Sequence, residues 1–239
     1  MSRAPGPHLP DGAEPMQIVM LLYPRLTQLD LTGPFEVLSR FRECKIDLVW
    51  KTTEPVRDAS GLTILPSCDF RNCPQADILF VPGGPGQSAL MEDEDVLSFL
   101  QEQAGSARYI TSVCTGSLVL GAAGLLKGYR ATCHWLSLSQ LSLLGAEPVA
   151  ERVVHDRNRI TGAGVTSGID FALSLAAHLF GEERARKVQL QMEYDPQPPF
   201  SGGSPASAPA DLIAAVRADT AAFQEAREVL ARRAGAKLG

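Results

Sequence analysis

The chain has 239 residues, a formal net charge of -5 and 45% hydrophobic residues, which fits one large globular domain or a domain with an appendage. The acidic balance argues against a nucleic-acid partner, because phosphate binding requires a basic surface. No apolar stretch approaches the roughly 20 residues of a membrane span. The five cysteines form neither a Cys-x-x-Cys pair nor a zinc-type cluster with histidine, so we expect a reduced, cytoplasmic protein without bound metal.

The N-terminal part is expected to contain a leader, a strand and a helix. Residues 1–15 are rich in Pro and Gly, and we expect a disordered leader there rather than a signal peptide. Residues 17–23 are an apolar run of strand length, typical of a strand buried on both faces. We expect a loop through Asp30 next, and then a helix that has Pro34 in its first turn and ends near Arg42.

The middle of the chain alternates strands with helices. Its pattern predicts strands at residues 46–51, 77–81, 109–113, 152–155 and 159–162, and helices at 93–104, 135–144, 168–180 and 182–192. It also predicts a hairpin or an edge excursion at 56–65 and an extended piece at 129–134. This alternation predicts an α/β fold with a doubly wound, mostly parallel sheet under helices on both faces. We expect the main domain to comprise residues 16–194.

The C-terminal part is expected to be an appendage. Residues 195–210 are dominated by Pro, Gly, Ser and Ala, and they predict an extended arm without a core of its own. An amphipathic helix capped by Asp211 is expected to follow and to end near Arg233. Residues 195–239 are therefore expected to pack on the main domain or on a second copy of the chain.

Cys114 stands where the strand predicted at residues 109–113 passes into a helix. A cysteine at such a junction lies on a tight turn, where the free N–H groups and the dipole of the helix favour the thiolate. The sequence therefore predicts a nucleophile with a lowered pKa, and a buried structural cysteine is the alternative. The neighbouring Thr115 either donates its hydroxyl into the site or caps the helix.

Three predicted buried strands are followed by residues that carry reactive or hydrogen-bonding groups. The first leads to Asp30, another to Gly83 and Gly84, and a third to Cys114. Because the carboxyl ends of parallel strands share one edge of a sheet, one cleft can hold them all. The glycines either offer N–H groups to a developing negative charge or form a plain turn. Asp30 is either an acid–base group or a helix cap, and His134 is either a partner of Cys114 or a structural histidine.

Four segments carry a resemblance to a known family. They are QLDLTGPFE at 28–36, VPGGPG at 81–86, TSVCTGS at 111–117 and RATCHW at 130–135. These segments resemble the PfpI-like branch of the class I glutamine-amidotransferase-like superfamily, and within it the isonitrile hydratases. The likeness extends to the C-terminus and includes the arm at 198–205. It implies a flavodoxin-like three-layer sandwich and a homodimer.

The same resemblance implies roles for the site residues. Cys114 is implied to be the nucleophile and Asp30 its acid–base partner, while Thr115, Gly83 and Gly84 line the site. Protease-like relatives carry histidine where this chain has Thr115, and glyoxalase-like relatives carry glutamate where this chain has Asp30. We therefore expect hydration of a small-molecule isonitrile to an N-substituted formamide through a thioimidate on Cys114, with no metal or organic cofactor.

Two other functions remain open. A similar sandwich with a similar Ser-Val-Cys-Thr-Gly segment forms the sensory half of transcription regulators of the arabinose-regulator type. Those chains continue into helix-turn-helix units, whereas one predicted helix follows the arm here. The second alternative is a thiol-dependent glyoxalase or deglycase that acts on small aldehydes.

Overall fold

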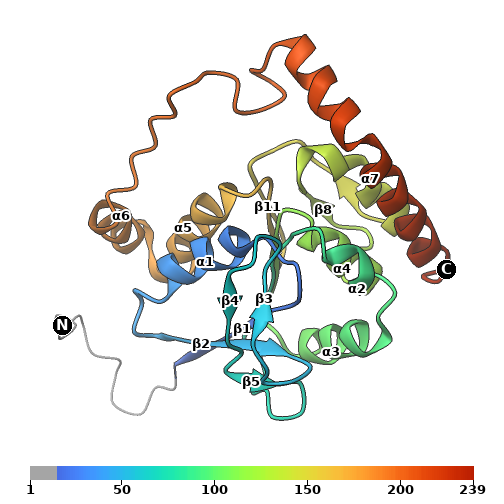
Figure 1. Ribbon diagram of the computed structural model, residues 1–239. Helices are drawn as coiled ribbons and strands as arrows, with labels where there is room; N and C mark the ends of the chain where they lie inside the picture. Colours follow the sequence, from blue (N-terminus) through green and yellow to red (C-terminus); the bar gives the residue numbers. More distant parts are fainter. Residues whose placement is uncertain (1–14) are drawn as a thin grey trace.

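The computed structural model describes residues 15–239 and shows one sheet between two layers of helices (Figure 1). The strands of the seven-stranded sheet are, in order across it, β10 (Val153–Asp156), β11 (Arg159–Gly162), β7 (Tyr109–Val113), β6 (Ile78–Val81), β1 (Met16–Leu21), β2 (Cys44–Trp50) and β5 (Cys68–Asp69). β10 pairs antiparallel with β11, and the other neighbours pair parallel. The predicted flavodoxin-like sandwich is confirmed. The predicted leader lies outside the described residues apart from Pro15.

The central strands are apolar because helices cover both of their faces. All four residues of β6 are buried, and Ile18 to Leu21 of β1 are fully inaccessible to solvent. Continuous apolar runs of this kind are the pattern of a parallel sheet with two covered faces. The predicted strand at residues 17–23 and the predicted strand at 77–81 are therefore confirmed as the centre of the core.

The helices form two layers (Figure 1). One layer contains α1 (Gln28–Leu38), α5 (Ser167–Phe180) and α6 (Glu182–Gln191). The other contains α2 (Gln87–Leu90), α3 (Glu94–Ala104), α4 (Gly116–Ala122) and the 3-10 helix η1 (Trp135–Leu144), on which the C-terminal helix α7 (Ala210–Ala236) packs. Within residues 15–239, no helix combines the length and the apolarity that crossing a bilayer would require.

The first helix begins earlier than the sequence predicted. α1 starts at Gln28, so Asp30 lies in its first turn instead of in a loop, and Pro34 lies inside the helix. Proline inside a helix removes one backbone hydrogen bond, which ordinarily disfavours it there. Packing against α5 offsets this cost, because Gly168 leaves room for the Pro34 ring. A Cβ at Gly168 would come within 3.0 Å of the Pro34 Cδ.

Several smaller elements differ from the prediction. The helix predicted at residues 135–144 is confirmed, and it is a 3-10 helix; this stretch contains several serines, whose hydroxyls compete for backbone hydrogen bonds. The N-cap of α7 is Pro209, so Asp211 lies in the first turn and is not the cap. The predicted hairpin is confirmed as β3 (Val56–Arg57) and β4 (Thr63–Ile64). The extended piece predicted at 129–134 contains β8 (Arg130–Ala131), which pairs with β9 (Glu147–Pro148); the sequence did not predict β9, α2 or β5.

The C-terminal appendage has one docked part and one exposed part. Residues 195–209 form neither helix nor strand, as predicted, and the side chain of Phe200 in this arm is 82% exposed. Ala231 and Ala234 near the end of α7 are buried. The backbone there lies so close to η1 that a Cβ at Gly235 would come within 1.9 Å of the Leu143 carbonyl oxygen. The end of α7 therefore belongs to the body of the protein.

This close approach predicts that Gly235→Ala destabilises the protein. The added methyl group meets a backbone atom that no rotamer change can move, so α7 must shift away from η1. Overpacking of this kind costs about 1–3 kcal/mol. Thermal unfolding should show a melting temperature lower by roughly 3–10 °C.

The matched control is Gly203→Ala in the exposed arm, where an added Cβ has no atom within 4 Å. This control should melt like the wild type. An unchanged melting temperature for Gly235→Ala would mean that α7 does not dock as described.

Candidate active site

The carboxyl ends of three adjacent strands bring the predicted site residues together. β7, β6 and β1 are neighbours in the sheet, and they lead to Cys114, Gly83 and Asp30. The Gly83 N–H donates a hydrogen bond of 3.1 Å to the Asp30 Oδ2. A Cβ at Gly83 would lie 2.7 Å from that oxygen and 2.8 Å from the Cys114 Cβ. Glycine at this position thus allows the carboxyl group and the cysteine to share one small space.

Cys114 occupies a strained turn between β7 and α4. Its φ of 56° lies in the left-handed region, which residues other than glycine rarely adopt. Its N–H points to the end of β11 and donates to the carbonyls of Gly162 at 3.0 Å and Ala163 at 2.7 Å. Gly116 lets the helix start close to β6, since a Cβ there would come within 2.1 Å of the Val81 oxygen. Strain of this type is characteristic of nucleophile turns.

Thr115 joins the two loops that flank the cysteine. Its Oγ1 accepts a hydrogen bond of 3.0 Å from the Gly84 N–H, and its side chain makes no capping bond to α4. The Gly83 N–H is likewise engaged, by Asp30. Both glycine N–H groups are thus occupied in this structure, and these bonds hold Asp30 and Thr115 in place. That the N–H groups face a developing negative charge during the reaction stays a prediction.

Burial dominates the electrostatics of Asp30. The side chain is fully buried, and its Oδ1 has no hydrogen-bond partner. Burial raises the pKa of the carboxyl group from 3.8 to about 7, against the lowering effect of hydrogen bonds with the Cys114 side chain and the Gly83 N–H. Asp30 is thus able to gain or lose a proton near neutral pH.

The prediction of a lowered pKa for Cys114 is wrong. Burial raises the pKa of this thiol well above its ordinary value, and the negative charges of Asp30 and Cys133 raise it further. A hydrogen bond from the Thr115 N–H has the opposite effect, which is the helix contribution that the sequence suggested. That contribution is smaller because the side chain is only 5% exposed and faces another acid. In the resting site the sulfur is therefore a thiol.

Two buried groups were missed from the sequence. Tyr23, two residues after β1, donates its hydroxyl to the Pro82 carbonyl at 2.9 Å. Burial, and after it the charge of Asp30, raises the pKa of Tyr23. Arg227 comes from α7 and is 4% exposed. A charged residue among apolar positions of an amphipathic helix was a signal that could have been noticed. Tyr23 gave no comparable signal, since it ends an apolar strand.

His134 has a structural role in this arrangement. Its Nδ1 accepts a hydrogen bond of 3.4 Å from the Leu136 N–H at the start of η1. Burial lowers the pKa of His134, and the positive charge of Arg227 lowers it further. Within residues 15–239, no group of three His, Cys, Asp or Glu side chains is placed to hold a metal ion. A surface depression of about 900 Å³ lies along α6 and contains none of the predicted site residues.

Comparison with known proteins identifies the family. The DJ-1/PfpI family model matches residues 16–178. The chain belongs to the DJ-1/PfpI family. It is 52% identical to an isonitrile hydratase of Pseudomonas putida over 223 residues, which cover 93% of this chain and 98% of that protein. It is 33% identical to the HTH-type transcriptional regulator GbdR of Pseudomonas aeruginosa, over 75% of this chain and 50% of the regulator.

A solved structure extends the likeness to almost the whole fold. The crystal structure of a ThiJ/PfpI family protein from Pseudomonas syringae matches with a TM-score of 0.90 and 45% identity. The match covers 96% of this chain and 98% of that one. The family match stops at residue 178, so the arm and α7 lie outside it. The matches to the Pseudomonas putida hydratase and to the Pseudomonas syringae structure reach over nearly the entire length.

The raised pKa of Asp30 predicts how stability should depend on pH. Its folded-state pKa of about 7 exceeds the ordinary 3.8, so the native protein binds the extra proton and loses stability as pH rises through this interval. Asp30→Asn removes this loss. The variant should therefore gain stability relative to the wild type between about pH 5.5 and 8.5, by on the order of 2 kcal/mol.

Melting temperatures of both proteins at the two pH values measure this difference. Asp219→Asn on the exposed side of α7 is the matched control and should show no such trend. A constant difference between Asp30→Asn and wild type across the range would contradict the raised pKa.

Proposed function

We propose that this chain hydrates isonitriles to N-substituted formamides, with Cys114 as the nucleophile and Asp30 as the acid–base group. The observation that carries the proposal is the 52% identity across 98% of the isonitrile hydratase of Pseudomonas putida. The buried Cys114–Asp30 pair at the edge of the sheet supports it, because the reaction needs one thiol and one proton carrier. The regulator GbdR is less similar and matches over half of its length.

The first step forms a thioimidate. Asp30, as a carboxylate, accepts the thiol proton of Cys114 while the sulfur attacks the isonitrile carbon. The carboxyl group then delivers that proton to the same carbon, which has gained electron density. One S–C bond and one C–H bond form and no atom leaves, so the product is R–N=CH–S–Cys114. A carboxyl group with a pKa of about 7 suits both the acceptance and the delivery of this proton.

The second step releases the formamide. Asp30, again a carboxylate, takes a proton from water while the oxygen of that water attacks the thioimidate carbon, and it passes this proton to the nitrogen. The C–S bond then breaks and the carbonyl forms, and the proton of the added hydroxyl group passes through Asp30 to the sulfur. The released product is R–NH–CHO, and the thiol and carboxylate are restored. A single carboxyl group thus serves as base and acid in turn.

Burial explains how a thiol with a raised pKa can work as a nucleophile. A weakly acidic thiol gives a strongly nucleophilic thiolate once its proton is removed. The carboxylate beside it is a desolvated base whose pKa is raised by the same burial. The two groups therefore need only exchange one proton between them, with no thiolate present at rest.

A product assay tests the function. The protein should convert cyclohexyl isocyanide into N-cyclohexylformamide, identified by mass spectrometry, and Cys114→Ala should abolish this activity. Cys44→Ala, which removes a thiol from the opposite part of the fold, should keep it. Conversion of methylglyoxal in place of the isocyanide would support the glyoxalase alternative, and conversion of neither would leave the ligand-sensing alternative as the better account.

Asp30→Asn tests the acid–base role. The amide keeps the shape of the side chain but carries no proton between sulfur and carbon, so kcat/KM should fall by roughly 10²–10⁴. In the wild type, kcat/KM should rise with pH through about 7, as Asp30 loses its proton, and this rise should disappear in the variant. A folded Asp30→Asn protein with near wild-type kcat/KM would rule out this role.

We also propose that the chain forms a homodimer through its C-terminal appendage. The arm has little core of its own, and Phe200, Leu212 and Phe223 expose 82%, 49% and 43% of their side chains. Exposed apolar side chains on the arm and on α7 are suited to contact with a second copy. Light scattering at micromolar concentration should report twice the 25.6 kDa chain mass. A monomer under these conditions would disprove the dimer.

A further inference from the structure

We propose that Ser112 and Ser117 are positioning residues of this site, because the hydrogen bond between their side chains fastens together the two ends of the turn that carries Cys114. The proposal rests on the nucleophilic role of Cys114 given above. Neither serine was predicted to be a site residue from the sequence. The structure assigns them a part in the reaction through the position that they give to the sulfur atom.

The bond connects the strand before the cysteine with the helix after it. Ser112 is the fourth residue of β7 and Ser117 is the second residue of α4, so Cys114 lies between them in the chain. The two Oγ atoms are 2.8 Å apart. A side-chain bond of this kind links the end of β7 directly to the first turn of α4. The backbone of the turn between them is therefore restrained from both ends.

The direction of the bond follows from a second hydrogen bond. The Ser117 Oγ donates its single proton to the Thr132 carbonyl oxygen at 2.7 Å, so it accepts the proton of Ser112. The Thr132 N–H in turn donates to the Thr161 Oγ1 of β11 at 2.9 Å. The bond across the turn is thus part of a chain of hydrogen bonds that joins β7, α4, the segment after β8 and β11.

Burial makes these hydroxyl groups depend on one another. Ser112, Ser117 and Thr161 are fully inaccessible to solvent, and Thr132 is nearly so. A buried hydroxyl group without a hydrogen bond destabilises a protein, because it has lost its contact with water. Alanine at position 112 would need no partner at all. The serine there is explained by the bond that it makes across the turn.

The turn needs this restraint because its backbone is strained. The φ of Cys114 is 56°, and a residue other than glycine keeps such a conformation only where its surroundings hold it. The carbonyls of Gly162 and Ala163 hold the N–H of Cys114 at the end of β11. The bond between Ser112 and Ser117 holds the two ends of the turn. Together these contacts fix the backbone from which the sulfur projects.

The position of the sulfur matters because the space around it is small. A Cβ at Gly83 would lie 2.8 Å from the Cys114 Cβ and 2.7 Å from the Asp30 Oδ2. The thiol and the carboxyl group exchange a proton across this space in the proposed reaction. A misplacement of about 1 Å can lower a rate by roughly 10²-fold. Release of the turn therefore disturbs the proton transfer from sulfur to carboxylate.

Thr111 offers a matched comparison in the same strand. It is fully buried, and its Oγ1 donates to the Leu79 carbonyl of β6 at 2.8 Å. Successive side chains of a strand point to opposite faces, so Thr111 and Ser112 lie on different sides of the sheet. Thr111→Val and Ser112→Ala each remove one buried hydroxyl group from β7. Ser112→Ala releases the turn, whereas Thr111→Val leaves the bond across it intact.

The test measures the reactivity of Cys114 without any isonitrile. The rate of its alkylation by iodoacetamide is followed by peptide mapping from pH 6 to pH 9. In the wild type the rate should rise near pH 7, where Asp30 loses its proton and can accept that of the thiol. Ser112→Ala should lose this rise and react about tenfold more slowly at pH 8, because the sulfur no longer faces the carboxylate. Thr111→Val should keep the wild-type profile.

Kinetics with the isonitrile give a second measurement. Ser112→Ala should lower kcat about tenfold and leave KM within about twofold, because the positioning of the sulfur acts on the transition state. Thr111→Val should keep both constants, although each variant should melt at a lower temperature than the wild type. A loss of stability alone does not produce this difference between the two variants.

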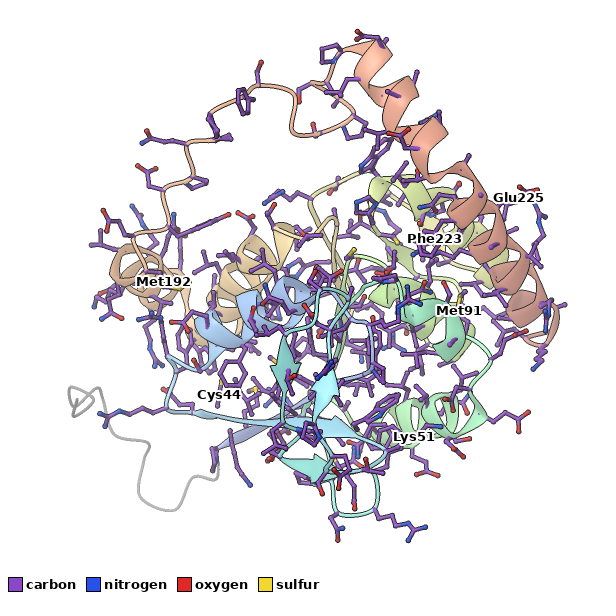
Figure 2. All side chains as sticks on the ribbon, viewed as in Figure 1. Cys44, Lys51, Met91, Met192, Phe223 and Glu225 are labelled. Carbon is purple, nitrogen blue, oxygen red and sulfur yellow. The ribbon has the colours of Figure 1, made fainter. Side chains whose placement is uncertain are left out.

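Two controls complete the experiment. Cys44 at the start of β2 lies away from α4, as Figure 2 shows, and an unchanged rate for its alkylation demonstrates that the fold stays closed. If Ser112→Ala does not fold, Ser117→Ala breaks the same bond and carries the same prediction. A folded Ser112→Ala or Ser117→Ala protein with the alkylation profile of Thr111→Val overturns the proposal. Because alkylation needs no hydratase activity, a wild type that converts no isonitrile would end the proposed function and leave this comparison decisive.

Discussion

The site depends on the burial of the Asp30 carboxyl group against the Cys114 side chain. Both groups are inaccessible or nearly so, and one N–H bond from Gly83 holds the carboxyl group in place. Burial moves the pKa of Asp30 to about 7 and is the largest cause that raises the pKa of the Cys114 thiol. The pair therefore behaves as a proton-exchanging unit instead of as two independently ionised groups.

Several features of the fold allow the contact between Asp30 and Cys114. Glycine at position 83 leaves the space that the two side chains share, and Gly116 lets α4 begin beside β6. The strained backbone of Cys114 is held by two carbonyl groups at the end of β11. α7 packs on η1 from outside the family-wide domain and carries the buried Arg227. The strained backbone of Cys114 and the buried charge of Arg227 both lower the stability of the fold.

The sequence was sufficient to predict the sheet, the helices on both faces and the meeting of three strand ends. These follow from apolar runs, glycine turns and the rule that parallel strands end at one edge. The sequence did not predict where α1 begins, because contact with α5 allows Pro34 inside the helix. The sequence also could not predict that the pKa of Cys114 is raised, since this shift depends on the burial of the side chain.

The most direct test of the account is to trap the intermediate. The protein is mixed with excess isonitrile, quenched with acid after short times and digested for mass spectrometry. The account predicts that the peptide containing Cys114 gains the full mass of the isonitrile, because no atom leaves in the first step. Formation of the formamide with no adduct on Cys114 at any quench time, or with the adduct on another residue, would contradict it.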